Sequence, residues 1–158
     1  MAVYVGLDNG AASDGFGFGV GSDLSLQGFV PASGGFFGGG ASLPDTNAWY
    51  HVVMLRTNGT ISFFVNGQKT PSTSTAAVTM PSDMTFGSQN GTRYFAGALD
   101  DIRIYNRALT TNEVAVIYAG NEGPCFPHAA AATGVLFNGF VVAATIIDAA
   151  VVIPMLPL

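Results

Sequence analysis

The sequence is poor in cysteine and in charge, and both shortages exclude classes of protein. Cys125 is the only cysteine, so no disulfide can form within the chain. This suits either a reducing compartment or a bacterial exterior, where disulfides are optional. Charged residues make up only 9% of the 158 residues, and the five basic ones form no run. Binding to nucleic acid requires a basic patch, so we expect no such partner.

Glutamate is scarce as well, and this weighs against catalysis. Glycoside hydrolysis needs two carboxylates that flank one bond, whereas the only glutamates are Glu113 and Glu122. Asp100 and Asp101 are adjacent, so on a strand their side chains point to opposite faces and form no pair. The sequence also has no nucleophile elbow that would mark a Ser-His-Asp site. We therefore expect a protein that is not an enzyme.

Apolar residues and glycine are what the sequence has in quantity. Hydrophobic residues make up 49% of the chain, and there are 21 glycines. Low charge together with much glycine, valine, phenylalanine and threonine is typical of an all-β domain. The length is enough for one domain with a core of its own. The fold class that we predict is an antiparallel β-sandwich of two sheets.

Two glycine-rich stretches near the N-terminus predict different structures, a strand and a loop. Phe16, Phe18 and Val20 alternate strictly with glycines, which predicts a strand with one apolar and one bare face. A dinucleotide site is disfavoured there because no helix follows the glycines. Leu24 then begins a second predicted strand. Residues 31–40 contain five glycines and predict a loop.

The clearest hairpin joins residues 48–56 to residues 60–65 through an Asn-Gly dipeptide, which favours a tight turn. The first of these strands is apolar on both faces, so we expect a central strand that is covered on both sides. Trp49 and His51 belong to it and are expected to be structural. As a catalytic base, His51 would need an acid or a nucleophile nearby, and the sequence offers none. Residues 71–77 follow as a predicted Ser/Thr loop.

Thr110 and Glu113 predict the start of one short helix. Their spacing is that of a capping box, in which each side chain accepts a hydrogen bond from the other residue's backbone N–H. Gly120 is a natural C′ residue, so we expect a helix of about residues 111–119. A helix of this length is not stable alone and must pack on the sheet.

Ile102 and Ile104 alternate with polar neighbours and predict a half-buried strand just before this helix. Asp100 falls on the same face as these isoleucines, so a regular strand would point its carboxylate at the core. A buried carboxylate needs hydrogen-bond donors, a cation or a metal. Two interpretations stay open: Asp100 ties down a neighbouring loop or helix end, or it is a metal ligand.

The stretch from residue 95 to residue 113 resembles the C-terminal signature of laminin-G-like, concanavalin A-like jelly-roll domains of bacterial surface and secreted proteins. The family pattern is roughly F-x-G-x-I-D-[DE]-[VI]-R-[IV]-Y-x-R-x-L-[ST]-x-x-E. The matching residues are Phe95, Gly97, Asp100, Asp101, Arg103, Tyr105, Arg107, Leu109, Thr110 and Glu113. Upstream, Trp49, His51 and Val52 resemble the family's W-x-H-V strand, and residues 64–67 resemble its [YF]-V-[ND]-G hairpin.

This resemblance implies a jelly roll and a module that binds a glycan or a surface polymer without catalysis. Phe36, Phe37 and Tyr94 are the aromatic residues expected to stack on sugar rings. The alternative is a structural spacer or protein-interaction module with no small ligand. A glycoside hydrolase relative is a remote third reading, because the same fold also hosts glucanases.

The resemblance also makes Asp100 a candidate ligand for calcium. Related sandwiches often hold a structural Ca2+ near the rim of the sheets, and calcium takes carboxylate and carbonyl oxygens together. Residues 8–10 and 88–91 are rich in Asp, Asn or Gly and are the expected source of further ligands. The bland alternative is that Asp100 accepts backbone hydrogen bonds and binds no metal.

The chain divides by composition into a jelly-roll domain over residues 1–121, a linker over 122–128 and an apolar tail over 129–158. The tail is uncharged up to residue 147, as in a membrane span, but polar residues interrupt it and no basic residue flanks it. An Asn-Gly dipeptide between two apolar runs favours a β-hairpin instead. The first residues lack the features of a signal peptide. We expect a piece of a longer extracellular or cell-surface protein whose N-terminal strands lie upstream.

Overall fold

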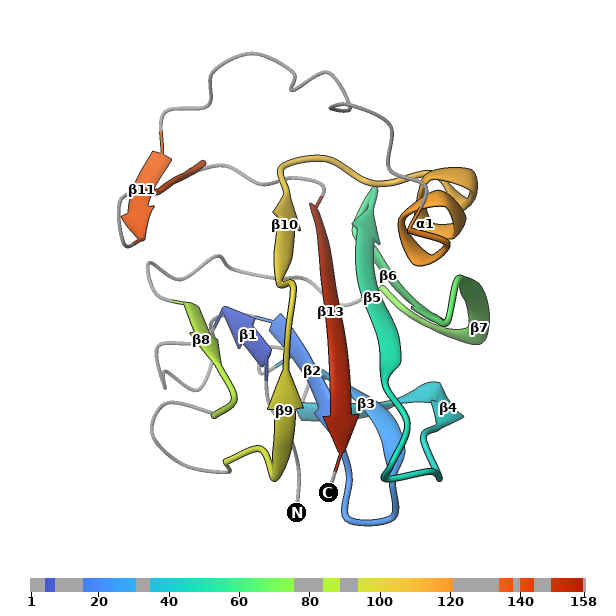
Figure 1. Ribbon diagram of the computed structural model, residues 1–158. Coiled ribbons are helices and arrows are strands. Elements are labelled where there is room, and N and C mark those ends of the chain that lie inside the picture. The colour runs from blue at the N-terminus through green and yellow to red at the C-terminus, as the bar shows by residue number, and fades with distance from the viewer. Residues whose placement is uncertain are drawn as a thin grey trace.

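The computed structural model describes residues 5–7, 16–30, 35–75, 84–88, 94–120, 134–137, 140–143 and 149–157. These residues contain thirteen strands and one helix, α1 (Thr111–Tyr118) (Figure 1). The strands are β1 (Val5–Leu7), β2 (Phe16–Val20), β3 (Ser25–Val30), β4 (Gly35–Ser42), β5 (Tyr50–Thr57), β6 (Thr60–Val65), β7 (Gln68–Ser74), β8 (Met84–Phe86), β9 (Gly97–Leu99), β10 (Arg103–Tyr105), β11 (Gly134–Phe137), β12 (Phe140–Ala143) and β13 (Ala149–Pro157).

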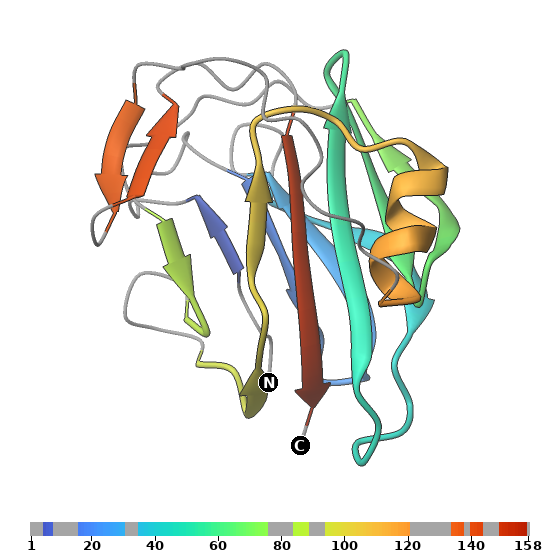
Figure 2. The ribbon, with the colours of Figure 1, turned by 45° about the horizontal axis from the view of Figure 1, so that its top comes forward.

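Two antiparallel sheets form the body of the domain. The first sheet has the order β4-β3-β2-β1-β8, and the second has the order β10-β13-β5-β6-β7, with β9 also paired to β13. Figure 2 shows α1 against the second sheet, on the side that faces away from the first. The predicted two-sheet sandwich with one short helix is therefore confirmed.

The main core fills the space between the sheets. β3 alternates buried and half-buried residues, as expected for a strand with one face on a core. Phe18 of β2 meets Phe63 of β6 edge to face, with ring centroids 6.1 Å apart. The buried residues of this core are Phe18, Val20, Leu26, Val30, Leu43, Tyr50, Val52, Met54, Ile61 and Phe63.

A second, smaller core lies on the outer face of the second sheet, under the helix. Val53, Leu55 and Phe64 point outward from the sheet, and Leu109, Val114 and Ile117 close over them. Because four consecutive residues of β5, 52–55, are buried on alternating faces, this strand is covered on both sides, as the sequence predicts. The helix begins at the predicted residue and ends at Tyr118, one residue before the predicted end, and its burial explains how so short a helix is stable.

Two stretches that the sequence predicts to be loops are strands. β4 covers much of residues 31–40, and β7 includes residues 71–74. Glycine has little local preference, so pairing with β3 determines the conformation of β4. A glycine at position 28 also lets the ring of Phe37 lie directly on the β3 backbone. Pro71 is tolerated in β7 because β7 is an edge strand.

The edges formed by β4 and β7 close one side of the sandwich. The Ser72 hydroxyl donates a hydrogen bond to the carbonyl oxygen of Gly38. Gly40 has a positive φ of 75° and lies so close to Ser72 that a side chain at position 40 would collide with it.

The turn before β3 includes Leu24, which has φ 61°, so the second strand begins one residue later than the sequence predicts.

β13 is a central strand of the second sheet, although the sequence assigns it to the apolar tail. Its backbone pairs with β5 at seven positions, with β10 at three and with β9 at three. Figure 1 shows it between β10 and β5. The expected linker over 122–128 lies outside the described residues. Local patterns missed the role of β13 because strand pairing across the chain leaves no local signal.

The predicted hairpin in the tail is confirmed. β11 and β12 pair antiparallel with Phe137 opposite Phe140, around the Asn-Gly dipeptide. Among the described residues, no helix has the length and apolar character needed to cross a membrane.

Pro154 fits the register of β13. His51 exchanges backbone hydrogen bonds with Asn66 on the β6 side: its carbonyl oxygen accepts at 2.8 Å, and its N–H donates to the Asn66 side chain at 3.0 Å. The backbone of His51 therefore turns away from β13. Pro154, its partner in the register, needs no N–H toward β5 and faces instead the break between β9 and β10. The ladder thus loses no bond to this proline.

The same register predicts the effect of moving a proline by one residue. Ile153 pairs with Val52, whose backbone faces β13, so Ile153→Pro leaves the buried Val52 carbonyl without a donor. We expect a loss of about 1–3 kcal/mol in unfolding free energy beyond that of Ile153→Ala. Urea unfolding of both variants and of Pro154→Ala checks this. Equal midpoints for Ile153→Pro and Ile153→Ala would contradict the register.

Candidate functional site

The end of the second sheet where β13 finishes carries an exposed tryptophan. Trp49 is 49% exposed and lies one residue before β5. The sequence predicts a structural Trp49 in a strand that is covered on both sides, but the covered part begins only at Tyr50. The indole ring of Trp49 is therefore accessible to a ligand.

The turn that leads into Trp49 is held by several hydrogen bonds. The Asn47 N–H donates to the Asp45 carboxylate at 2.9 Å, which closes an Asx turn. The Ala48 N–H donates to the Asp45 carbonyl at 3.3 Å. The Asp45 N–H in turn donates to the hydroxyl of the buried Tyr50 at 3.0 Å. Trp49 therefore projects from a fixed backbone.

Asp100 does not point at the core, so that prediction is wrong. The chain leaves β9 at Leu99 and enters β10 only at Arg103, and Asp101 between them has φ 46°. This left-handed residue breaks the alternation on which the prediction rests. Asp100 is exposed and accepts the N–H of Asp101 at 2.8 Å. Ile102 is exposed as well, by 37%.

Arg103 forms a two-point ion pair with Asp101. Its Nε donates to Oδ1 at 3.0 Å, and its Nη2 donates to Oδ2 at 2.6 Å. The side chains are 30% and 56% exposed, so water reaches the pair. The parallel fork geometry nevertheless fixes the guanidinium plane.

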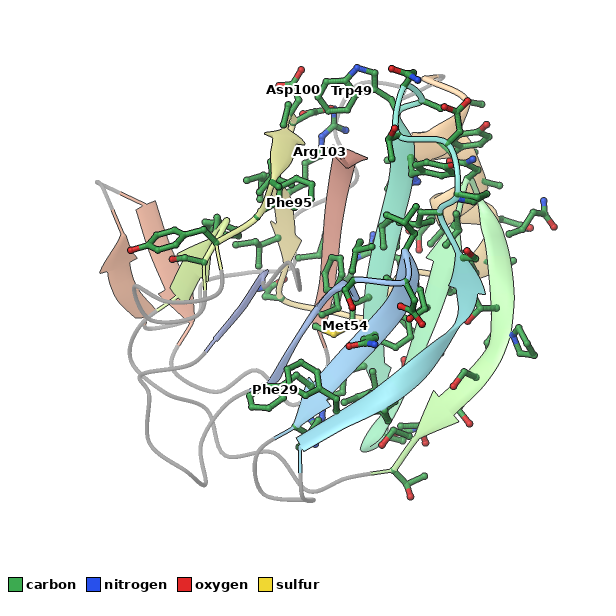
Figure 3. All side chains as sticks on the ribbon, turned by 90° about the horizontal axis from the view of Figure 1, so that it is seen from below. Phe29, Trp49, Met54, Phe95, Asp100 and Arg103 are labelled. Atoms are coloured by element: carbon green, nitrogen blue, oxygen red, sulfur yellow. The ribbon has the colours of Figure 1, made fainter. Side chains whose placement is uncertain are left out.

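Trp49, Asp100 and Arg103 lie at the same end of the second sheet (Figure 3). Met155 of β13 pairs with Tyr50 on one side and with Leu99 on the other. Because neighbouring strands are about 4.8 Å apart, β5 and β9 run roughly 10 Å from each other here. Arg103 is paired further along β13, opposite Val152 and thus level with Val53 of β5, and its guanidinium bonds to Asp101 in the break. We call the group of Trp49, Asp100, Asp101 and Arg103 the rim site.

The described residues around Asp100 do not by themselves fit a calcium site. No group of three His, Cys, Asp or Glu residues that could hold a metal occurs in the described part of the chain. At the rim site, both carboxylate oxygens of Asp101 are bonded to Arg103. Of the loops expected to supply further ligands, residues 8–10 and 89–91 lie outside the described residues. Calcium binding stays a prediction.

The three aromatic residues predicted to bind sugar are divided between surface and core. Phe36 is 44% exposed and packs on Phe29, with ring centroids 4.7 Å apart. Phe37, the next residue in β4, points to the opposite face and packs on the core residue Phe63 at 5.9 Å. Tyr94 is 58% exposed just before β9. Phe37 thus faces the core, whereas Phe36 and Tyr94 are open to solvent.

His51 makes packing contacts on the helix side of the second sheet. Its ring lies against that of Tyr118 at the end of α1, with centroids 5.6 Å apart. Gly67, at positive φ, lies under the same tyrosine. These contacts join the β6–β7 turn, β5 and the helix.

The predicted capping box at the start of α1 is present. The Glu113 N–H donates to the Thr110 hydroxyl at 3.2 Å, and the Thr110 N–H donates to the Glu113 carboxylate at 2.7 Å. Arg107 adds a second fork, with its Nη1 and Nη2 donating to the two carboxylate oxygens of Glu113 at 3.0 and 2.7 Å. The hydrogen bond from Arg107, and then that from the Thr110 backbone, lowers the pKa of Glu113 to about 2.

Comparison with known proteins identifies the family. The family model described as the concanavalin A-like lectin/glucanases superfamily matches residues 1–115. The chain belongs to this superfamily. Usherin from Mus musculus is 32% identical over 89 residues, which is 51% of this chain and 2% of usherin. The chain therefore spans a small fraction of the length of that relative.

Among solved structures, the chain is similar to that of an S-layer domain-containing protein from Clostridium thermocellum. The identity is 20% and the TM-score is 0.42, over 71% of this chain and 59% of that one.

The helix cap makes a measurable contribution to the free energy of unfolding. Thr110→Ala removes the oxygen that accepts the Glu113 N–H, and we expect it to lower the unfolding free energy by about 1 kcal/mol. Thr111→Ala makes the same chemical change at the next, exposed position and is the matched control. Thermal unfolding of both variants measures the difference. Equal melting midpoints for the two would show that Thr110 does not cap the helix.

The Glu113 carboxylate also predicts a pH dependence. Its pKa falls from 4.5 to about 2 on folding, so the unfolded chain takes up the proton first as the pH falls. The stabilisation is complete above about pH 4.5 and disappears as the pH falls through about 2. Glu113→Gln should show a weaker loss of unfolding free energy between pH 6 and pH 3 in urea titrations. A loss as steep as that of the wild type would contradict the role of Arg107.

Proposed function

We propose that this domain is a non-catalytic carbohydrate-binding module of an extracellular or cell-surface protein, and that it binds a glycan at the rim site. The observation that carries the proposal is the exposed Trp49 on a fixed turn, at the same end of the sheet as the Arg103–Asp101 fork. Membership of the lectin/glucanase superfamily supports the ligand class.

The rim site offers both kinds of contact that a sugar ring needs. The face of the Trp49 indole suits the apolar face of a pyranose, while its edge stays in water. Asp100 and Arg103 present an acceptor and donors for the ring hydroxyls. The turn and the ion pair hold these groups before a ligand arrives, so less conformational entropy is lost on binding.

The negative charge of the chain favours a neutral glycan over a polyanionic one. The net charge is −5, and carboxylates make up half of the rim site. A sulfated or otherwise polyanionic glycan would be repelled by this field. We therefore propose a neutral polysaccharide as the ligand.

The geometry of the carboxylates supports binding without hydrolysis. A glycosidase needs one carboxylic acid and one carboxylate that face each other across the bond. Here Asp101 is held by Arg103 through both oxygens, and Asp100 accepts the backbone N–H of the very next residue. Both groups are thus engaged in shaping the loop.

A second candidate is a protein-interaction role on the helix. Val116 is 37% exposed on α1, and Tyr118 is 50% exposed at the end of the helix, where its ring also packs on His51. Exposed apolar and aromatic side chains of this kind suit a protein contact. If the domain is a spacer or an adhesion unit, this surface is where a partner would bind.

Retention on insoluble neutral polysaccharides, followed by a glycan array, tests the proposal. Trp49→Ala should weaken binding about tenfold or more, which corresponds to about 1.4 kcal/mol of lost stacking. Arg103→Lys should weaken it less, because one donor replaces a fork. Phe36→Ala removes an exposed aromatic ring on the other sheet, one that the sequence also predicts to bind sugar, and it should leave binding unchanged if the rim site is the binding site.

If Trp49→Ala binds the polysaccharide as tightly as the wild type does, the rim site is not the binding site. If the wild type binds no glycan, the spacer or protein-interaction role takes its place. Because Trp49 is exposed, the variant should keep the melting midpoint of the wild type, which separates lost binding from lost folding.

A further inference from the structure

The second sheet contains a strand slot, the gap between β5 on one side and β9 and β10 on the other, which β13 fills. All of the strand pairing of β9 and β10 runs through β13. Without β13, the sheet would have two unpaired edges next to the core. Such edges bind any strand of matching length and pattern.

We propose that two copies of this chain exchange β13, so that each strand fills the slot of the other copy. The exchanged strand keeps every backbone pairing that it has within one chain, because the slot of the second copy is identical. The partner is thus a second copy of the chain, and the interface is the register of β13 with β5, β9 and β10.

The connection to β13 permits this exchange. Residues 121–148 separate Gly120 from Ala149, and within this connection β11 and β12 form a hairpin over residues 134–143. The other 18 residues, 13 in 121–133 and 5 in 144–148, have a contour length of up to roughly 60 Å, which is more than the width of the slot. Because β13 is covalently connected to its own slot, the slot of a second copy competes only when the concentration of chains approaches the effective concentration of β13, for which an upper range on the order of millimolar is typical of linked modules.

The prolines of β13 make the exchange specific. Pro154 has no N–H to donate toward the β9–β10 side, and in this register it faces the break at Asp100–Ile102. At most other places in a sheet, a central proline would cost a ladder bond. β13 is therefore a poor match for an unrelated slot between two strands and a good match for the slot of an identical chain.

A disulfide test distinguishes exchange from other association. Val53 and Val152 are register partners, and the backbone of Val53 faces β6, so they form a close, non-hydrogen-bonded pair across β5 and β13. Cysteines at such a pair are within reach of a disulfide. One full-length chain carries Val53→Cys and another carries Val152→Cys, both with Cys125→Ser and with different tags. They are refolded together under mild oxidation.

We expect a covalent heterodimer of the two chains. Its fraction should rise about tenfold for a tenfold rise in refolding concentration while it is the minor species, as mass action requires. Adding Ile153→Pro to the second chain should abolish it. A single chain with both Val53→Cys and Val152→Cys, refolded when dilute, should instead form the disulfide within itself.

Two results would overturn the proposal. In the first, the doubly substituted chain closes its internal disulfide but the two singly substituted chains never join, so the slot takes only its own strand. In the second, the doubly substituted chain forms no disulfide, so β13 does not lie in the slot at all.

Discussion

The backbone of β5 must be hydrogen-bonded on both edges, and the rest of the structure depends on this constraint. Residues 52–55 are buried on both faces of the sheet, under the first sheet on one side and under α1 on the other. Water cannot satisfy their N–H and C=O groups, and each unpaired group would cost several kcal/mol. β6 pairs one edge and β13 pairs the other.

This constraint connects the core to the rim site. β13 places β9 and β10 in the sheet, and the break between those strands sets the positions of Asp100 and Arg103. β5 begins at Tyr50, whose hydroxyl fixes the turn that carries Trp49. The positions of the rim-site residues therefore depend on strand pairing, and they are kept only while β13 stays paired with β5, β9 and β10.

Local signals predicted well those elements whose conformation is determined locally. The capping box at Thr110 and Glu113 and the hairpin around Asn58-Gly59 were read correctly because the interacting groups lie within a few residues. β4 and β7 were missed because their pairing partners decide their conformation. β13 was missed for the same reason over a much longer separation in sequence.

The rim site was predicted only in part, for a physical reason. The sequence indicates Asp100, but it predicts the wrong direction for its side chain, because the alternation assumes a regular strand. Asp101 adopts the left-handed conformation, which Asp tolerates better than most residues. The apolar run predicts Trp49 inside a covered strand, although Asp45 and Asn47 just before it favour an Asx turn. A turn so close to a tryptophan is a signal that could have indicated exposure.

Amide hydrogen exchange of β5 tests the central role of β13 most directly. The N–H groups of Val53 and Leu55 face β6, whereas those of Val52 and Met54 face β13. With β13 in place, all four amides exchange at rates within about tenfold of one another, through opening of the whole sheet. Fast exchange at Val52 and Met54, with Val53 and Leu55 still protected, would show that this edge of β5 is open and would contradict the strand order.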